Sequence, residues 1–206
     1  MQLRHCTVGP WSTNAYAMVC RGTGKSVLID PGADPYALQI LLEDTVPAAI
    51  LVTHSHFDHI GALREMRRLL KVPVMGHAGV MDNSPLSADV WLRGGERLPV
   101  GDHFVTVTHA PGHTPDQLCF GIEEDARMIV GDTVFDGGPG KTWTTEQFQT
   151  TLITLRRIVL AWPDHTVCHP GHGAAFRLGD IRRQIERFVA ADHGEFCGDA
   201  EWEMKV

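Results

Sequence analysis

Residues 53–62, THSHFDHIGA, place three histidines and an aspartate within six positions, directly after an apolar run. Side chains two positions apart in an extended segment point the same way, so His54 and His56 are expected to converge at the end of a strand. Asp58 and His59, where the chain turns into a helix, should face a neighbouring point. Imidazole and carboxylate are ligands for zinc, iron and manganese, and two such ions in one site lie about 3.5–4 Å apart. This short stretch therefore predicts ligands for two metal ions.

A pair of ions needs more ligands, and three further residues offer them in turns after apolar runs. They are His113 in APGHTPDQ, Asp132 in IVGDTVF and His172 in HPGHGAA. Each follows a glycine, which lets the backbone turn sharply and lets another group approach closely. We therefore expect all three near the first four residues.

The elements around the first stretch can be predicted from local patterns. Residues 15–20 and 26–30 indicate two strands joined by a glycine-containing turn. Asp34 suits the cap of a helix that starts at Pro35, and residues 48–53 are typical of a buried strand. Downstream, apolar residues keep helical spacing from Ile60 until Pro73 forbids continuation.

The second half of the chain repeats this mixture. Residues 103–110, 117–122, 127–131 and 166–169 are strand-like. Thr144 and Gln147 suit a capping box at the start of a long helix, and residues 180–192 form a last amphipathic helix. Strands thus occur in two groups, each mixed with helices, which favours an α/β architecture of two packed sheets with helices outside.

Composition limits the classes of function. The chain has 206 residues, 43% hydrophobic and 21% charged, which suits one domain over residues 1–206. The formal net charge is −7, and no basic tract could follow a phosphate backbone, so we expect no nucleic-acid partner. The sequence shows neither a secretory signal nor an apolar run of about 20 residues that would span a bilayer. We expect a soluble, cytoplasmic protein that does not bind membranes.

The five cysteines are scattered and form no C-x-x-C pair. Neither a disulfide framework nor a cysteine-bound zinc is therefore expected.

Taken in order, H-x-H-x-D-H, a separate histidine, the aspartate of GDT and a final histidine resemble the metallo-β-lactamase superfamily. The resemblance spans the chain from the early hairpin to His172. It implies a four-layer αββα sandwich, in agreement with the two groups of strands. It also implies two divalent metal ions, with zinc expected and iron or manganese as alternatives. Its ligand assignment gives one metal to His54, His56 and His113 and the other to Asp58, His59 and His172, with Asp132 as the bridge.

Residues 131–143, GDTVFDGGPGKTW, look like the segment after the bridging aspartate in glyoxalase II. This narrower resemblance implies hydrolysis of a small thioester or related acyl ester by a metal-bound hydroxide. Asp58 would orient the hydroxide or accept a proton, and is the candidate catalytic residue. Lys141 is a candidate for binding a carboxylate of the substrate, with an exposed lysine as the alternative. Trp143 could flank the pocket, but a tryptophan before a helix is more often a packing anchor.

The resemblance thins at the C-terminus. Longer glyoxalase II proteins add a helical region that supplies much of the glutathione site, whereas the residues after Gly173 leave room for one helix and a tail. A different acyl thioester, a lactone or another small ester thus remains open, as does the oligomeric state.

Other activities share these ligands. A mononuclear iron persulfide dioxygenase is the main alternative. Lactam hydrolysis is disfavoured because B1 and B2 β-lactamases place a cysteine in their second site, where this chain has Asp58 and His59. A metal-stabilised interaction module without activity is the third possibility. His109 and His169, close to ligands in sequence, are candidates for orienting them.

Overall fold

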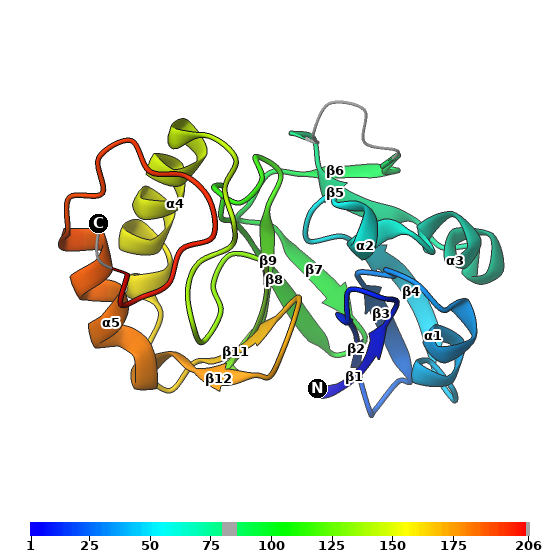
Figure 1. Cartoon of the computed structure of the whole chain (residues 1–206). Coiled ribbons are helices and arrows are strands. Elements are labelled where there is room, and N and C mark those ends of the chain that lie inside the picture. Colours follow the sequence, from blue (N-terminus) through cyan, green and yellow to red (C-terminus); the bar gives the residue numbers. More distant parts are fainter. Residues whose placement is uncertain (80–85, 205–206) are drawn as a thin grey trace.

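The computed structural model describes residues 1–79 and 86–204. These residues form two six-stranded sheets. The sheets lie face to face, with helices outside them (Figure 1). The first sheet follows chain order: β1 (Gln2–Val8), β2 (Thr13–Val19), β3 (Lys25–Ile29), β4 (Val46–Leu51), β5 (Val74–His77) and β6 (Val90–Leu92). The second has the order β12 (Phe176–Arg177), β11 (Val167–Pro170), β10 (Arg127–Gly131), β9 (Leu118–Ile122), β8 (His103–His109) and β7 (Arg97–Val100).

Each sheet mixes parallel and antiparallel neighbours. In the first sheet, β3 pairs antiparallel with β2 and parallel with β4. In the second, β10 pairs antiparallel with β9 and parallel with β11. The predicted αββα sandwich with two mixed sheets is therefore confirmed.

The alternation of side chains along β2 separates two layers of the core. Tyr16 and Met18 join the cluster between the sheets. Ala15 and Ala17 point the other way and pack with Leu38 of α1 (Pro35–Leu41). Every residue of β2 is buried, because both faces of the first sheet are covered.

A third cluster covers the outer face of the second sheet. It joins Val130 and Cys168 of the sheet to α4 (Thr145–Arg157) and α5 (Leu178–Ala190). The rings of Phe148 on α4 and Phe188 on α5 meet edge to face, with centroids 6.0 Å apart.

The predicted helix starts are confirmed for two helices. The Asp34 side chain accepts a hydrogen bond from Ala37 N at the start of α1. Thr144 and Gln147 form the expected capping box before α4, which is followed by the short 3-10 turn η1 (Val159–Ala161). Helix α5 lies two residues earlier than predicted at both ends. No helix among the described residues is long and apolar enough to cross a membrane.

The single helix predicted from Ile60 is wrong, because the structure has two helices there: α2 (Phe57–Ile60) and α3 (Leu63–Leu70). The chain between them packs closely on the loop after β3. A β-carbon on Gly61 would lie 2.4 Å from the carbonyl oxygen of Gly32, and Ala62 N donates to Pro31 O at 2.9 Å. This contact with a distant segment interrupts the helix despite its helical spacing.

Candidate metal centre

The predicted site residues lie at one edge of the sandwich, where strands of both sheets end. Four of them follow β4: His54 and His56, then Asp58 and His59 in α2. Three follow strands of the second sheet: His113 after β8, Asp132 after β10 and His172 after β11. The two sheets are joined at this edge because Asn14 N donates to Gly171 O at 2.7 Å. Residues far apart in sequence therefore meet in one place.

His54, His56 and His113 form the first group. Nδ1 of His56 lies 3.0 Å from Nε2 of His54 and 3.0 Å from Nε2 of His113. The three ligand atoms lie within 4.8 Å of one another. The structure thus brings together the first predicted ligand set.

Asp58, His59 and His172 form the second group. Oδ2 of Asp58 lies 3.5 Å from Nε2 of His59 and 3.2 Å from Nε2 of His172. These atoms also lie within 4.8 Å of one another. The second predicted set is brought together as well.

The carboxylate of Asp132 faces both groups. Its Oδ1 lies 3.5 Å from Nε2 of His59, and its Oδ2 lies 3.5 Å from Nε2 of His172 and 3.6 Å from Nε2 of His113. This position between the groups is the one that a bridging ligand requires.

Backbone carbonyls orient one histidine of each group. His113 Nδ1 donates to Lys141 O at 2.7 Å, and His172 Nδ1 donates to Trp11 O at 3.0 Å. Since a carbonyl oxygen only accepts, both Nδ1 atoms carry the proton, and in the neutral rings each Nε2 keeps a lone pair. Both lone pairs point toward the centre of the site.

Asp30 is a residue of this site that the sequence analysis missed. Its carboxylate accepts hydrogen bonds from His59 Nδ1 at 2.8 Å, Thr53 N at 2.7 Å and Thr53 Oγ1 at 2.6 Å. It therefore orients His59 as the two carbonyls orient the other rings. An aspartate that ends a buried apolar strand, SVLID, was the available signal.

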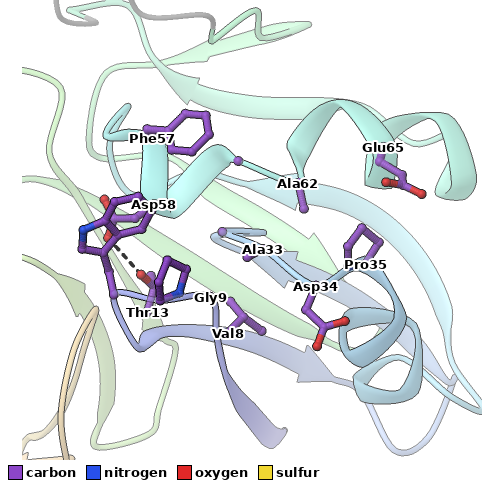
Figure 2. Close-up of a pocket in the computed structure, with 14 residues that line it drawn as sticks. Val8, Gly9, Thr13, Ala33, Asp34, Pro35, Phe57, Asp58, Ala62 and Glu65 are labelled. Carbon is purple, nitrogen blue, oxygen red and sulfur yellow. Dashed lines mark hydrogen bonds between the residues drawn. The ribbon is translucent and has the colours of Figure 1, made fainter.

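Asp58, the candidate catalytic residue, is held by Thr13, whose Oγ1 donates to Asp58 Oδ2 at 2.9 Å (Figure 2). Burial opposes the charge of this carboxylate, but hydrogen bonds with His172 and Thr13 and the nearby His59 hold its pKa below the ordinary value. Asp58 is therefore ionised near neutral pH.

Two buried polar atoms in the centre test whether metal ions fit it. His59 Nε2 and Asp132 Oδ1 are buried and have no hydrogen-bond partner among the described residues. Gly171 leaves space there, since a β-carbon at this residue would lie 2.1 Å from Asp132 Oδ1. Unpaired buried polar atoms are costly, whereas imidazole and carboxylate donors match divalent zinc, iron or manganese. The residues present fit divalent cations.

The protonation of the first group agrees with this fit. Burial and the neighbouring histidines lower the pKa of His54, that of His56 to about 4 and that of His113 to about 3. These rings stay neutral, the form that binds metals. Burial also opposes the charge of His59, but carboxylates led by Asp132 raise its pKa to about 9. The second group therefore attracts positive charge.

The centre opens into a cleft of about 720 Å³. Trp11, Phe57 and Trp143 line it and are 60%, 65% and 49% exposed. Of the two expectations for Trp143, the structure supports a place beside the pocket rather than a packing anchor: its ring lies at the cleft, with its centroid 5.3 Å from that of His56. Aromatic side chains thus form much of the wall around the predicted ligands.

Lys141 also lines this cleft. Its Nζ donates to Asp199 Oδ2 at 2.9 Å, so the ammonium lies near the centre and is paired. Binding of a substrate carboxylate by Lys141 stays a prediction.

His109 and His169 lie in other surroundings. The ring of His109 stacks on that of His77, with centroids 4.0 Å apart, and its Nε2 donates to Pro115 O. His169 packs edge to face against Tyr16, with centroids 5.9 Å apart. Among the described contacts, neither orients a predicted ligand; Asp30 and the carbonyls of Lys141 and Trp11 do this instead.

The sequence of the chain is similar to those of known proteins. A family model described as the metallo-beta-lactamase superfamily matches residues 8–184. The probable metallo-hydrolase YqgX of Bacillus subtilis is 31% identical over 193 residues, which cover 84% of this chain and 90% of that protein. The hydroxyacylglutathione hydrolase of Klebsiella pneumoniae is 28% identical over 170 residues, which cover 81% of this chain and 64% of that enzyme.

Solved structures are similar over most of the chain. ETHE1 from Myxococcus xanthus is 27% identical with a TM-score of 0.79, covering 93% of this chain and 86% of that one. The B3 metallo-beta-lactamase BLEG-1 is 28% identical with a TM-score of 0.77, covering 88% and 97%. TTHA1623, solved in a di-iron-bound form, is 32% identical with a TM-score of 0.74, covering 87% and 97%. With its family match, its fold and its converging ligand residues, this chain belongs to the metallo-beta-lactamase superfamily.

Proposed function

We propose that the protein is a binuclear metal-dependent hydrolase that acts on a small acyl thioester, with zinc as the expected metal. The observation that carries the proposal is the convergence of two ligand groups, which share Asp132, at an open cleft. Relatives named hydroxyacylglutathione hydrolase support the thioester, including one from Rhodopseudomonas palustris that is 34% identical over 154 residues.

Each of the two predicted ligand sets would bind one cation. His54, His56 and His113 would hold one cation, Asp58, His59 and His172 the other, and Asp132 would contact both. When bound, the cations supply a Lewis acid for the substrate carbonyl and an attacking water whose pKa falls toward about 7.

Asp58 has the position of a proton acceptor. Its ionised carboxylate lines the cleft, and Thr13 fixes the direction of its Oδ2. It would orient the attacking water and take its proton as the water adds to the thioester carbon. Collapse of the tetrahedral intermediate then breaks the carbon–sulfur bond, the departing sulfur takes the proton held by Asp58, and the acid and the thiol are released.

The walls of the cleft suit a small substrate. Trp11, Phe57 and Trp143 offer apolar surface for the acyl or thiol part, and Lys141 offers a cation. After α5, residues 191–204 form no helix, and the match spans 64% of the Klebsiella enzyme.

A second candidate, the mononuclear iron persulfide dioxygenase, is favoured by one observation. His54, His59 and Asp132 also lie with their ligand atoms within 4.8 Å of one another. Two histidines and one carboxylate are the donor set of many non-haem iron oxygenases.

Activity without oxygen separates these candidates. We would load the protein with zinc, measure the metal content, and supply thioesters, esters and persulfides with and without oxygen. The hydrolase should bind about two ions per chain and release a thiol anaerobically, and His172→Ala should lower the stoichiometry. Strict dependence on oxygen with a persulfide would support the dioxygenase. A stoichiometry of one, unchanged in His172→Ala, would refute the second metal site.

A further inference from the structure

The segment after α5, shown in red in Figure 1, folds back onto the loop that follows β10. Thr142 N donates to Gly198 O at 3.1 Å, and Trp202 N donates to Gly137 O at 3.1 Å. The indole nitrogen of Trp202 donates to Asp136 O at 2.8 Å. These bonds fix the segment on both sides of residue 199.

Close packing holds the same contact. Ala200 and Trp202 are 8% and 7% exposed. A β-carbon on Gly138 would lie 2.1 Å from the carbonyl oxygen of Ala200, so the segment touches the loop backbone directly. The backbone that carries Asp199 is therefore anchored.

Asp199 forms an ion pair with Lys141, the only lysine or arginine among the described residues that line the cleft. Its Oδ2 accepts a hydrogen bond from Lys141 Nζ at 2.9 Å, and both side chains line the cleft with the predicted ligands. Lys141 is anchored as well, since its carbonyl accepts from His113 Nδ1 at 2.7 Å. The backbone of both residues of the ion pair is thus held in place beside the candidate metal centre.

We propose that Asp199 is a specificity-determining residue, which makes the cleft disfavour acyl thioesters that carry a carboxylate at their far end. This inference rests on the proposed hydrolase function. A substrate carboxylate that approaches Lys141 must displace the carboxylate of Asp199 and is repelled by it. A neutral substrate meets neither obstacle.

The exposure of the pair sets the size of the effect. The side chains of Lys141 and Asp199 are 47% and 78% exposed, so water and salt screen their interaction. An exposed pair of this kind changes an equilibrium by about two- to fivefold. Asp199 therefore biases the choice of substrate without blocking the cleft.

Matched ligands test the proposal by binding. The probes are two thioether analogues of an acyl thioester, alike except that one ends in a carboxylate and the other in a carboxamide. Their affinities for the metal-loaded protein would be measured by calorimetry. The preference is the affinity for the carboxylate analogue divided by that for the carboxamide analogue. Asp199→Asn should raise this ratio about two- to fivefold. Lys141→Gln should lower it, because the attracting charge is lost while Asp199 remains.

Glu195→Gln is the matched control, since this exposed tail carboxylate makes no ion pair among the described residues. It should leave the preference unchanged. An unchanged preference in Asp199→Asn, an equal shift in Glu195→Gln, or no binding of either analogue would overturn the proposal. The corresponding thioesters are assayed in parallel: if the parent releases no thiol while the analogues still bind with the expected preferences, the proposed function fails and the selecting role of Asp199 stands.

Discussion

His59 Nδ1 donates to Asp30 Oδ2 across 2.8 Å, and the two side chains are 0% and 1% exposed. Asp30 directly follows β3, whereas His59 lies in α2. Thr53 gives the same carboxylate two further hydrogen bonds. This buried network holds the His59 ring with Nε2 toward the centre, and it connects the first sheet to the ligand groups.

Asp30→Asn tests this positioning role. The new side chain keeps its size and tolerates the positive φ of 53°, but its single oxygen cannot replace both carboxylate oxygens, of which one accepts from Thr53 N and the other from His59 Nδ1. We expect zinc affinity at the second group to fall about 10- to 100-fold, measured by competition with a chelator. Asp44→Asn, an exposed residue with φ 61°, is the control. Parental affinity in Asp30→Asn would show that this bond does not position the ligand.

Cys168→Ala tests whether the reaction needs a thiol. Cys168 is 0% exposed, and burial raises its pKa to about 12, so it is neither accessible nor ionised. Thioester turnover should stay within a few-fold of the parent, while lost packing lowers the free energy of unfolding by about 1 kcal/mol. Activity assays and urea unfolding check both. A trapped acyl-cysteine, or lost turnover with metal retained, would contradict the proposed mechanism.

His169 should make stability depend on pH. Its Nε2 is buried without a hydrogen-bond partner among the described residues. Burial, followed by the charges of Arg127 and His5, lowers its pKa from 6.5 to about 4. As the pH falls through this window, the unfolded chain binds a proton that the folded chain refuses, so stability is lost. Above about pH 6.5 neither state is protonated, and the contribution is constant.

The difference between the parent and His169→Gln isolates this residue from the other histidines. Urea unfolding of the metal-free proteins would be compared at about pH 7, 5.5 and 4. The parent should lose stability relative to the variant between the first and last conditions. A difference that is independent of pH would show that His169 titrates normally in the folded protein.

Local patterns predicted the candidate ligand residues that the structure brings together, because their donor types and the glycines before three of them can be recognised in short segments of sequence. Asp30 was missed because its role depends on His59, which joins it only in the folded chain. The break at Gly61 likewise depends on contact with Gly32. The position of Asp199 depends on the return of the C-terminal segment to Lys141.

Strands show the same limit. The two-residue to four-residue strands β5, β6, β7 and β12 were not predicted, since pairing with neighbouring strands decides such short elements more than propensity does. The seven-residue edge strand β1 was missed as well, and its mixture of exposed and half-buried side chains explains the weak apolar signal.

Asp58→Asn is the most discriminating test of the proposed site. Asp58 Oδ2 lies 3.2 Å from His172 Nε2 and accepts a hydrogen bond from Thr13. The substitution keeps the size of the side chain and removes its charge, so it should weaken the second metal and slow hydrolysis by at least about 10²-fold. Thr13→Val removes only the supporting hydrogen bond and should slow hydrolysis less. Metal content, thermal unfolding and thioester turnover would be measured on one preparation, with unfolding close to that of the parent because β4 and the first ligand group are untouched. Two retained metals with parental turnover in Asp58→Asn would reduce Asp58 to a structural carboxylate and remove it from the second group.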